Sequence, residues 1–279
     1  MPKSGQRYER DFLARSPLLS ELCAFARPLI DRPGWPTLGD YTEFVDAERR
    51  CRAPELEPVC FAPAAAPKRR GRARAALELA QLYDGRIALE RQVPCLDASY
   101  HDLFNALVWA AFPRSKRALH ARQFRALQRR WQPGQTRLPN RRTPEQDALT
   151  IFDEGGGVVL GVEPEAPRAG ASSARCAEPA RAPRAVLFGH AVMEHVCFAA
   201  APVRAAALAV TPNSTVPDSA VTEAGGRELF EAIDRALAQR LADEAELTSV
   251  EFDGVLSIVP PERCGFAREP GGRASPRLQ

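Results

Sequence analysis

Three groups of residues in the middle of the chain combine side chains that could do chemistry. The first group consists of His101, Asp102 and Asn105. An imidazole titrates near neutral pH, and beside a carboxylate it can act as a general base or bind a metal. In the alternative interpretation, Asp102 closes a helix capping box and His101 bonds a neighbouring backbone group.

The second group places three carboxylates within eight residues, Asp147, Asp153 and Glu154, directly before the glycines at 155–157. Such a cluster could hold a divalent cation or activate water. The segment lacks the alternating oxygen ligands of an EF-hand loop, which excludes that class of calcium site. The alternative is a charged helix end followed by a turn.

The third group is His190 with Glu194, followed by His195. Residues four apart share one face of a helix, so the pair suits metal ligation or acid–base chemistry. The spacing matches neither H-E-x-x-H nor H-x-x-E-H, which excludes those zinc proteases. The alternative is a surface ion pair.

A basic stretch between residues 113 and 143 contains no Asp or Glu and could follow a phosphate backbone. Arg114 and Lys116 are its candidate substrate ligands. In the alternative, these side chains pair with the acidic segment at 223–246 inside the fold. The positive charges are Arg114, Lys116, Arg117, Arg122, Arg125, Arg129, Arg130, Arg137, Arg141 and Arg142.

Helices with recognisable ends must position these groups. Ser99 and Asp102 have capping-box spacing at the start of a helix that Pro113 ends. Ser115 is predicted to cap the next helix, over 116–131. A further capping box, Thr143 with Gln146, opens a short helix before the glycines.

The remaining patterns predict a mainly helical α+β domain with a small sheet and Pro/Ala-rich loops. Further helices are predicted at 16–26, 72–82, 190–196 and 225–244, a strand or extended link at 87–93, and strands at 158–162, 185–188 and 254–259.

The distribution of proline divides the chain. We expect residues 1–71 to form a helical segment and a Pro-rich loop (53–71) packed on a main domain at 72–268. That domain carries an inserted loop at 163–183, and 269–279 forms a disordered tail. No P-loop, G-x-G-x-x-G or G-x-S-x-G motif is present, which counts against the common nucleotide-binding and serine-hydrolase classes.

Composition limits the class of protein further. The 279 residues are 45% apolar and 26% charged, as in ordinary globular proteins. Only three of the 38 basic residues are lysine, so arginine is enriched throughout and is weak evidence for phosphate binding. The start has no apolar secretory segment, and the seven cysteines include no C-x-x-C pair. We expect a cytoplasmic protein with reduced thiols and no membrane contact.

Three sequence blocks resemble a proteobacterial domain family whose function is unknown. They are YHDLFNALVWAAFPRSK from Tyr100, DALTIFDEGG from Asp147 and FGHAVMEHV from Phe188. The resemblance extends over 77–259 and implies no activity, because the family has none to carry over. The sequence differs from the family pattern at His195, where a lysine or another polar residue is expected. It also lacks the family's Gly-Trp pair near 255–266.

The leading hypothesis is an enzyme of hydrolytic type acting on a phosphate-bearing substrate. Its candidate catalytic residues are His101, Asp102, Asp153, Glu154, His190 and Glu194, and its candidate substrate-binding residues are Asn105, Asp147, Arg114 and Lys116. A divalent metal is a candidate cofactor. Two alternatives stay open: a non-catalytic nucleic-acid or polyanion-binding protein that uses the Arg114–Arg142 stretch, and a structural or partner-binding protein in which the three blocks form a buried polar network. The oligomeric state is left open.

Overall fold

The computed structural model of the chain confirms a predominantly helical α+β fold with small sheets. It describes residues 7–20, 22–64, 76–96, 98–136, 138, 141–160, 185–198, 201–211 and 223–258. The inserted loop expected at 163–183 and the tail expected at 269–279 lie outside these residues. The domain boundaries proposed from the sequence stay a prediction.

The N-terminal part begins with a 3₁₀ turn, Phe12–Arg15, and then forms two short helices in place of the single helix expected at 16–26. The structure has α1 at Pro17–Ser20 and α2 at Cys23–Ile30. The following helix, α3 (Leu38–Arg52), was not predicted, although its capping box of Thr37 and Asp40 is visible in the sequence.

A small parallel sheet joins β1 (Cys60–Pro63) to β2 (Gln92–Cys95). The described part of the Pro-rich segment therefore contains a strand where we expected a loop. The helix expected at 72–82 is wrong over its described part. That part holds only a 3₁₀ turn, which α4 (Tyr83–Gly85) and a π turn (Arg86–Glu90) follow.

Two long helices, α5 (Tyr100–Ala111) and α6 (Pro113–Gln128), follow each other almost without a break. Pro113 ends one helix and opens the next, because proline fits the first helical position, where no intrahelical amide bond is needed. The predicted cap, Ser115, lies inside α6. The next helix, α7 (Pro144–Gly155), begins at the predicted capping box of Thr143 and Gln146.

The larger sheet has the strand order β4-β3-β5-β6. Its central pair, β3 and β5, is parallel, and both outer pairs are antiparallel. The strand β5 was not predicted, because VRAAALAV is rich in alanine, which favours helices. The strands and the last two helices are β3 (Gly156–Leu160), β4 (Ala185–Leu187), β5 (Val203–Val210), β6 (Gly254–Ile258), α8 (His190–Phe198) and α9 (Glu223–Ala242).

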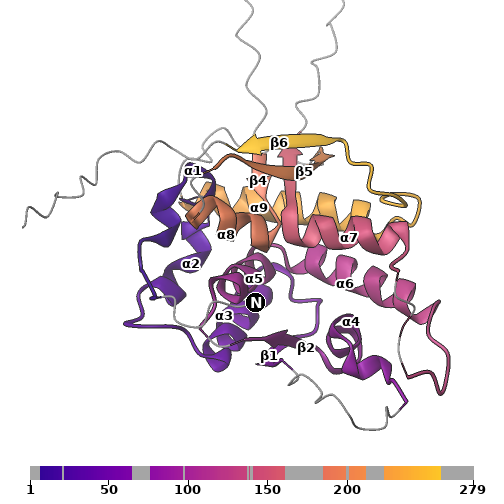
Figure 1. The fold of residues 1–279 in the computed structure, drawn as a ribbon. Coiled ribbons are helices and arrows are strands. Elements are labelled where there is room, and N and C mark those ends of the chain that lie inside the picture. The colour runs from indigo at the N-terminus through magenta and orange to yellow at the C-terminus, as the bar shows by residue number, and fades with distance from the viewer. Residues whose placement is uncertain are drawn as a thin grey trace, which may run out of the picture.

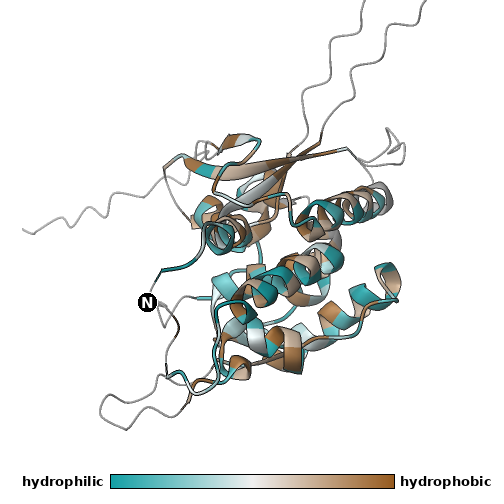
Figure 2. Ribbon diagram, turned by 90° about the vertical axis from the view of Figure 1, so that its right-hand side faces the viewer, coloured by the Kyte–Doolittle hydropathy of each residue, from teal (hydrophilic) through white to brown (hydrophobic). Residues whose placement is uncertain are grey.

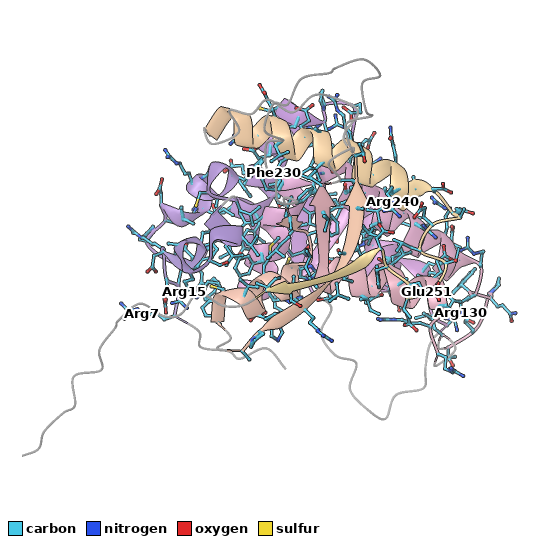
Figure 3. The ribbon with its side chains drawn as sticks, turned by 90° about the horizontal axis from the view of Figure 1, so that it is seen from above. Arg7, Arg15, Arg130, Phe230, Arg240 and Glu251 are labelled. Atoms are coloured by element: carbon cyan, nitrogen blue, oxygen red, sulfur yellow. The ribbon has the colours of Figure 1, made fainter. Side chains whose placement is uncertain are left out.

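The elements form layers (Figure 1). The larger sheet lies at the top, α7, α8 and α9 lie beneath it, and α5 and α6 lie below them, above β1 and β2. Seen from above, the strands run across these helices, and Phe230 of α9 lies on the side of the neighbouring helices (Figure 3). Apolar and polar segments alternate along the helices, as expected for helices with one buried face (Figure 2). Within the described part of the chain, no helix is long and apolar enough to cross a membrane.

Candidate functional site

Two histidines that are far apart in the sequence meet at the starts of two helices. His101 lies in the first turn of α5, and His190 is the first residue of α8. Their Nε2 atoms lie 3.1 Å apart, and the ring centroids are 4.4 Å apart at an angle of 69°. The structure therefore brings the first and third sequence groups together.

A glycine allows the start of α8 to lie close to the end of α7. Gly189 lies so close to the end of α7 that an added Cβ would be 2.5 Å from the backbone oxygen of Glu154 and from the amide of Gly156. Its own amide donates to the Gly156 carbonyl at 2.8 Å. Two residues before each functional side chain, Phe152 and Phe188 stack at 4.9 Å. Any larger residue at 189 would push His190 away from α7.

Two carboxylates complete the group. The Oε2 atom of Glu154 lies 3.5 Å from the His190 Nε2, and the Oε2 atom of Glu194 lies 3.7 Å from the His101 Nδ1. The side chains of His101, Glu154 and Glu194 are 41%, 45% and 31% exposed, whereas that of His190 is 3% exposed. The group thus has one buried member, and its other three members reach the surface.

Three of these residues could hold a metal ion. His101, Glu154 and His190 each offer one ligand atom, and the three atoms lie within 4.8 Å of one another. It is the only such group of three His, Cys, Asp or Glu side chains found among the described residues. Glu194 stands outside it.

Electrostatics keep His190 neutral. Burial lowers its pKa to about 3, and the nearby charges of Lys116 and His101 act in the same direction, while Asp153 opposes them. Burial also raises the pKa of Glu154 above its ordinary value, and the Asp153 carboxylate adds to that rise. A neutral imidazole is the form that accepts a proton or binds a metal.

Behind His190 lies a buried ion pair between the Lys116 Nζ and the Asp153 Oδ1, 2.5 Å apart. Burial alone would raise the pKa of Asp153, but the Lys116 ammonium outweighs it and holds that pKa well below its usual range. The Lys116 side chain is fully buried. Its prediction as a phosphate ligand is therefore wrong, because its charge is already neutralised inside the protein.

Further polar side chains line the same interior. Asn105 donates from Nδ2 to the Tyr83 hydroxyl at 3.3 Å, and the Nδ1 of His120 lies 3.0 Å from the Asp84 carboxylate. Among the described residues, the buried Asn105 Oδ1 and His120 Nε2 have no hydrogen-bond partner. Our sequence reasoning missed Tyr83, Asp84 and His120. The spacing of His120, one helical turn after Lys116, was the signal that could have found it.

Asp102 and Asp147 do not join the group. The Asp102 carboxylate accepts from the Leu96 amide at 2.9 Å, and the amide of Asp102 donates to the Ser99 Oγ. Asp102 therefore fixes the start of α5, which corrects its prediction as a catalytic residue. Asp147 lies in the first turn of α7, about 10 Å along the helix from Glu154 at 1.5 Å per residue.

Several arginines of the basic stretch have partners within the described part of the chain. Arg114 binds Glu55 at 2.7 Å, and Arg125 binds Glu244 at 3.1 Å. Arg122 is buried and binds Glu145 at 2.8 Å as well as the carbonyls of residues 241, 243 and 246 at the end of α9. The alternative of pairing with the acidic segment at 223–246 holds for Arg125 and for Arg114, whose Nη1 also lies 3.7 Å from the Asp234 carboxylate. Arg122 meets that segment only at backbone carbonyls, and its carboxylate partner is Glu145.

A second buried cluster joins α6 to α9, and we call Ser115, Arg122 and Asp234 the α6–α9 cluster. The two Asp234 carboxylate oxygens accept from the amides of Arg114 and Ser115 at 3.1 and 2.8 Å, and one also accepts from the Ser115 Oγ at 2.7 Å. Asp234 thereby caps α6 from another helix. The residue at the capping position of α6 itself is Phe112, whose side chain cannot accept a hydrogen bond.

Comparison with known proteins identifies a family and no activity. No curated protein and no solved structure matches the chain. A family model described as a protein of unknown function (DUF3025) matches residues 72–255, which include the histidine group and the α6–α9 cluster. The chain is therefore a member of the DUF3025 family.

Proposed function

We propose that this protein is an enzyme of hydrolytic type whose site is the group of His101, Glu154, His190 and Glu194. The observation that supports this proposal is the convergence of two imidazoles and two carboxylates from three helices, α5, α7 and α8. Hydrolysis requires a group that takes a proton from water, and an imidazole and carboxylates that reach solvent, here His101, Glu154 and Glu194, are suited to that task.

The proposed roles follow from position. His190 is neutral and buried, and His101 and Glu154 reach solvent beside it, so an activated water would be bound between them. Asn105 lies one helical turn after His101 on α5, but it is buried, so it supports the site from the interior. Asp153 acts from behind through Lys116 and His190 and touches no substrate.

We do not extend the proposal to a phosphate-bearing substrate or to nucleic acid. The charges predicted to attract phosphate are engaged within the fold at Arg114, Lys116, Arg122 and Arg125. Moreover, the carboxylates of Glu154 and Glu194 give the open side of the site a negative character, which opposes an anionic substrate unless a cation is bound.

The test is a hydrolysis screen with paired variants of α8. Purified wild type, His190→Ala and His195→Ala are assayed with p-nitrophenyl acetate, p-nitrophenyl phosphate, bis-p-nitrophenyl phosphate and a set of N-acyl amino acids. His195 is exposed on the same helix, and its ring bonds the Ala191 carbonyl of the helix itself at 2.9 Å, so it is the matched control. We expect turnover that is lost in His190→Ala and kept in His195→Ala. No turnover, or equal turnover in all three proteins, would contradict the proposal.

A further inference from the structure

We infer that the site binds a divalent transition metal of the zinc class through the Nε2 atoms of His101 and His190 and the carboxylate of Glu154. Glu194 would not bind the metal but would hold His101 in position from behind. This inference names the cofactor of the enzyme proposed above. Its catalytic role rests on that proposal, whereas binding of the metal does not.

The spacing of the ligand atoms carries the inference. Ligands about 2.0–2.1 Å from a zinc ion at tetrahedral angles lie roughly 3.3 Å from one another. The His101 and His190 Nε2 atoms are 3.1 Å apart, and the Glu154 Oε2 lies 3.5 Å from the His190 Nε2. Both distances are close to the edge of such a tetrahedron, and the third, between His101 and Glu154, lies within the 4.8 Å that encloses the three ligand atoms.

The kinds of ligand atom select the class of metal. Calcium and magnesium prefer oxygen ligands, whereas imidazole suits zinc, iron, copper and nickel. Two histidines with one glutamate form a common catalytic zinc set, in which a fourth position is left for water. The exposure of His101 and Glu154 places that fourth position on the solvent side of the site.

The charge balance also favours a cation. Asp153, Glu154 and Glu194 contribute three carboxylates around the two histidines, and the buried Lys116 ammonium is paired with Asp153. A bound dication would offset the charges of the other two.

We assign Glu194 a positioning role because it faces the nitrogen of His101 that would not bind the metal. Its carboxylate lies against Nδ1 of His101, the ring nitrogen that points away from His190. A metal on Nε2 fixes the proton of a neutral imidazole on Nδ1, from which it can be donated to a carboxylate. His101 needs such support because its side chain is 41% exposed, whereas His190 is held by burial.

The first experiment measures metal binding itself. Protein freed of metal by dialysis against a chelator is titrated with Zn²⁺ by calorimetry and with Co²⁺ by visible absorption. We expect one ion per chain, with an absorption spectrum typical of four-coordinate Co²⁺. His101→Ala and His190→Ala should each weaken Zn²⁺ binding at least 100-fold, and His195→Ala should leave it unchanged. Absence of stoichiometric binding, or equal binding in all variants, would overturn the inference.

The second experiment separates Glu194 from the ligands. Loss of a carboxylate that orients a metal-bound histidine lowers affinity about 10–100-fold. We expect Glu194→Gln to lose affinity in that range while the Co²⁺ spectrum keeps its shape and the melting temperature of the metal-free protein is unchanged. A changed spectrum would make Glu194 a ligand, and unchanged affinity would remove its role; either result overturns the assignment.

The two proposals fail in distinguishable ways. If Zn²⁺ binds as described but no substrate of the screen is hydrolysed, the metal inference stands and the proposed hydrolase does not. If hydrolysis depends on His190 but survives complete removal of metal, the enzyme stands and the metal inference is wrong.

Discussion

Two faces of α6 contact buried polar groups, and the groups differ in how completely they are bonded. In the α6–α9 cluster, both Asp234 oxygens, the Ser115 hydroxyl and all three Arg122 nitrogens have partners. On the site side, Asn105, His120 and His190 each keep one buried side-chain atom that has no hydrogen-bond partner among the described residues, whereas among the groups that contact Asp234 only the Arg114 Nη1, 3.7 Å from its carboxylate, does so. Because an unmet buried polar atom costs free energy, we interpret the first cluster as structural and the second as functional.

The largest expected effect concerns the buried ion pair on the site side. Lys116→Met leaves the Asp153 carboxylate buried without its cation, and we expect the free energy of unfolding to fall by about 3–5 kcal/mol. The double variant Lys116→Met/Asp153→Asn should recover most of that loss. Urea unfolding followed by circular dichroism measures both.

Arg125→Met is the matched control on the same helix. Its partner Glu244 is 60% exposed, so we expect a change below about 1 kcal/mol. If Lys116→Met lowers the free energy of unfolding no more than Arg125→Met does, the stability of the site side of α6 does not depend on the Lys116–Asp153 ion pair.

The next effect tests whether the α6–α9 cluster is only structural. Asp234→Ala removes the carboxylate that accepts from two backbone amides at the start of α6, while the Ser115 hydroxyl keeps the backbone carbonyl of residue 234 as an acceptor. We expect the free energy of unfolding to fall by about 2–3 kcal/mol, because these donors stay buried. The Zn²⁺ affinity of the folded variant, measured by calorimetry, should equal that of the wild type. Loss of metal binding in a folded Asp234→Ala protein would contradict this interpretation, because it would show that the α6–α9 cluster also supports the histidine site.

The two regions should also respond to pH with opposite signs. His190 has its pKa lowered from 6.5 to about 3, so the unfolded chain binds more protons between these values, and stability rises with pH. Burial raises the pKa of Asp234 above 3.8, so the folded chain binds more protons just above that pH, and stability falls as pH rises.

Variants convert this difference into a measurement. In metal-free protein between about pH 4 and 6.5, His190→Gln should lower the slope of unfolding free energy against pH, by at most about 1.4 kcal/mol per pH unit. Asp234→Asn should raise that slope. Urea unfolding at half-unit steps of pH gives both slopes, and a change of the same sign in the two variants would contradict the assigned environments.

Local signals predicted much of the fold. The capping box at Thr143 and the proline at 113 mark real helix boundaries, because these effects act within one turn of the chain. The strand β5 escaped prediction because its alanines favour a helix, and only pairing with β3 and β6 makes it extended. Ser115 was misassigned as a cap, because the residue that caps α6 lies 119 positions away at Asp234.

The candidate site could be predicted in part. Spacing predicted that His190 and Glu194 share a helix face, and both lie in the group that the structure assembles. Sequence could not show that Lys116 is buried, since lysine is usually exposed and only its contact with Asp153 makes burial possible. Nor could it show that Gly189 packs against the end of α7, which brings Glu154 to His190.

The smallest expected effect tests the unpartnered atom that distinguishes the two regions. The double variant Tyr83→Phe/Asn105→Leu removes a hydrogen-bonded pair at 3.3 Å together with the unpartnered Asn105 Oδ1. Replacing both partners by apolar groups of similar shape is close to neutral, so we expect a free energy of unfolding within about 1 kcal/mol of the wild type. Zn²⁺ affinity should not change, because neither residue belongs to the metal group.

The corresponding pair in the structural cluster supplies the contrast. Ser115→Ala/Asp234→Leu also removes a bonded pair, but it leaves two backbone amides of α6 without an acceptor and should cost about 2 kcal/mol or more. Thermal and urea unfolding of the two double variants in parallel give the comparison directly. If Tyr83→Phe/Asn105→Leu lowers the free energy of unfolding as much as Ser115→Ala/Asp234→Leu does, the Asn105 oxygen contributes to stability, through a bound water, and its role is structural.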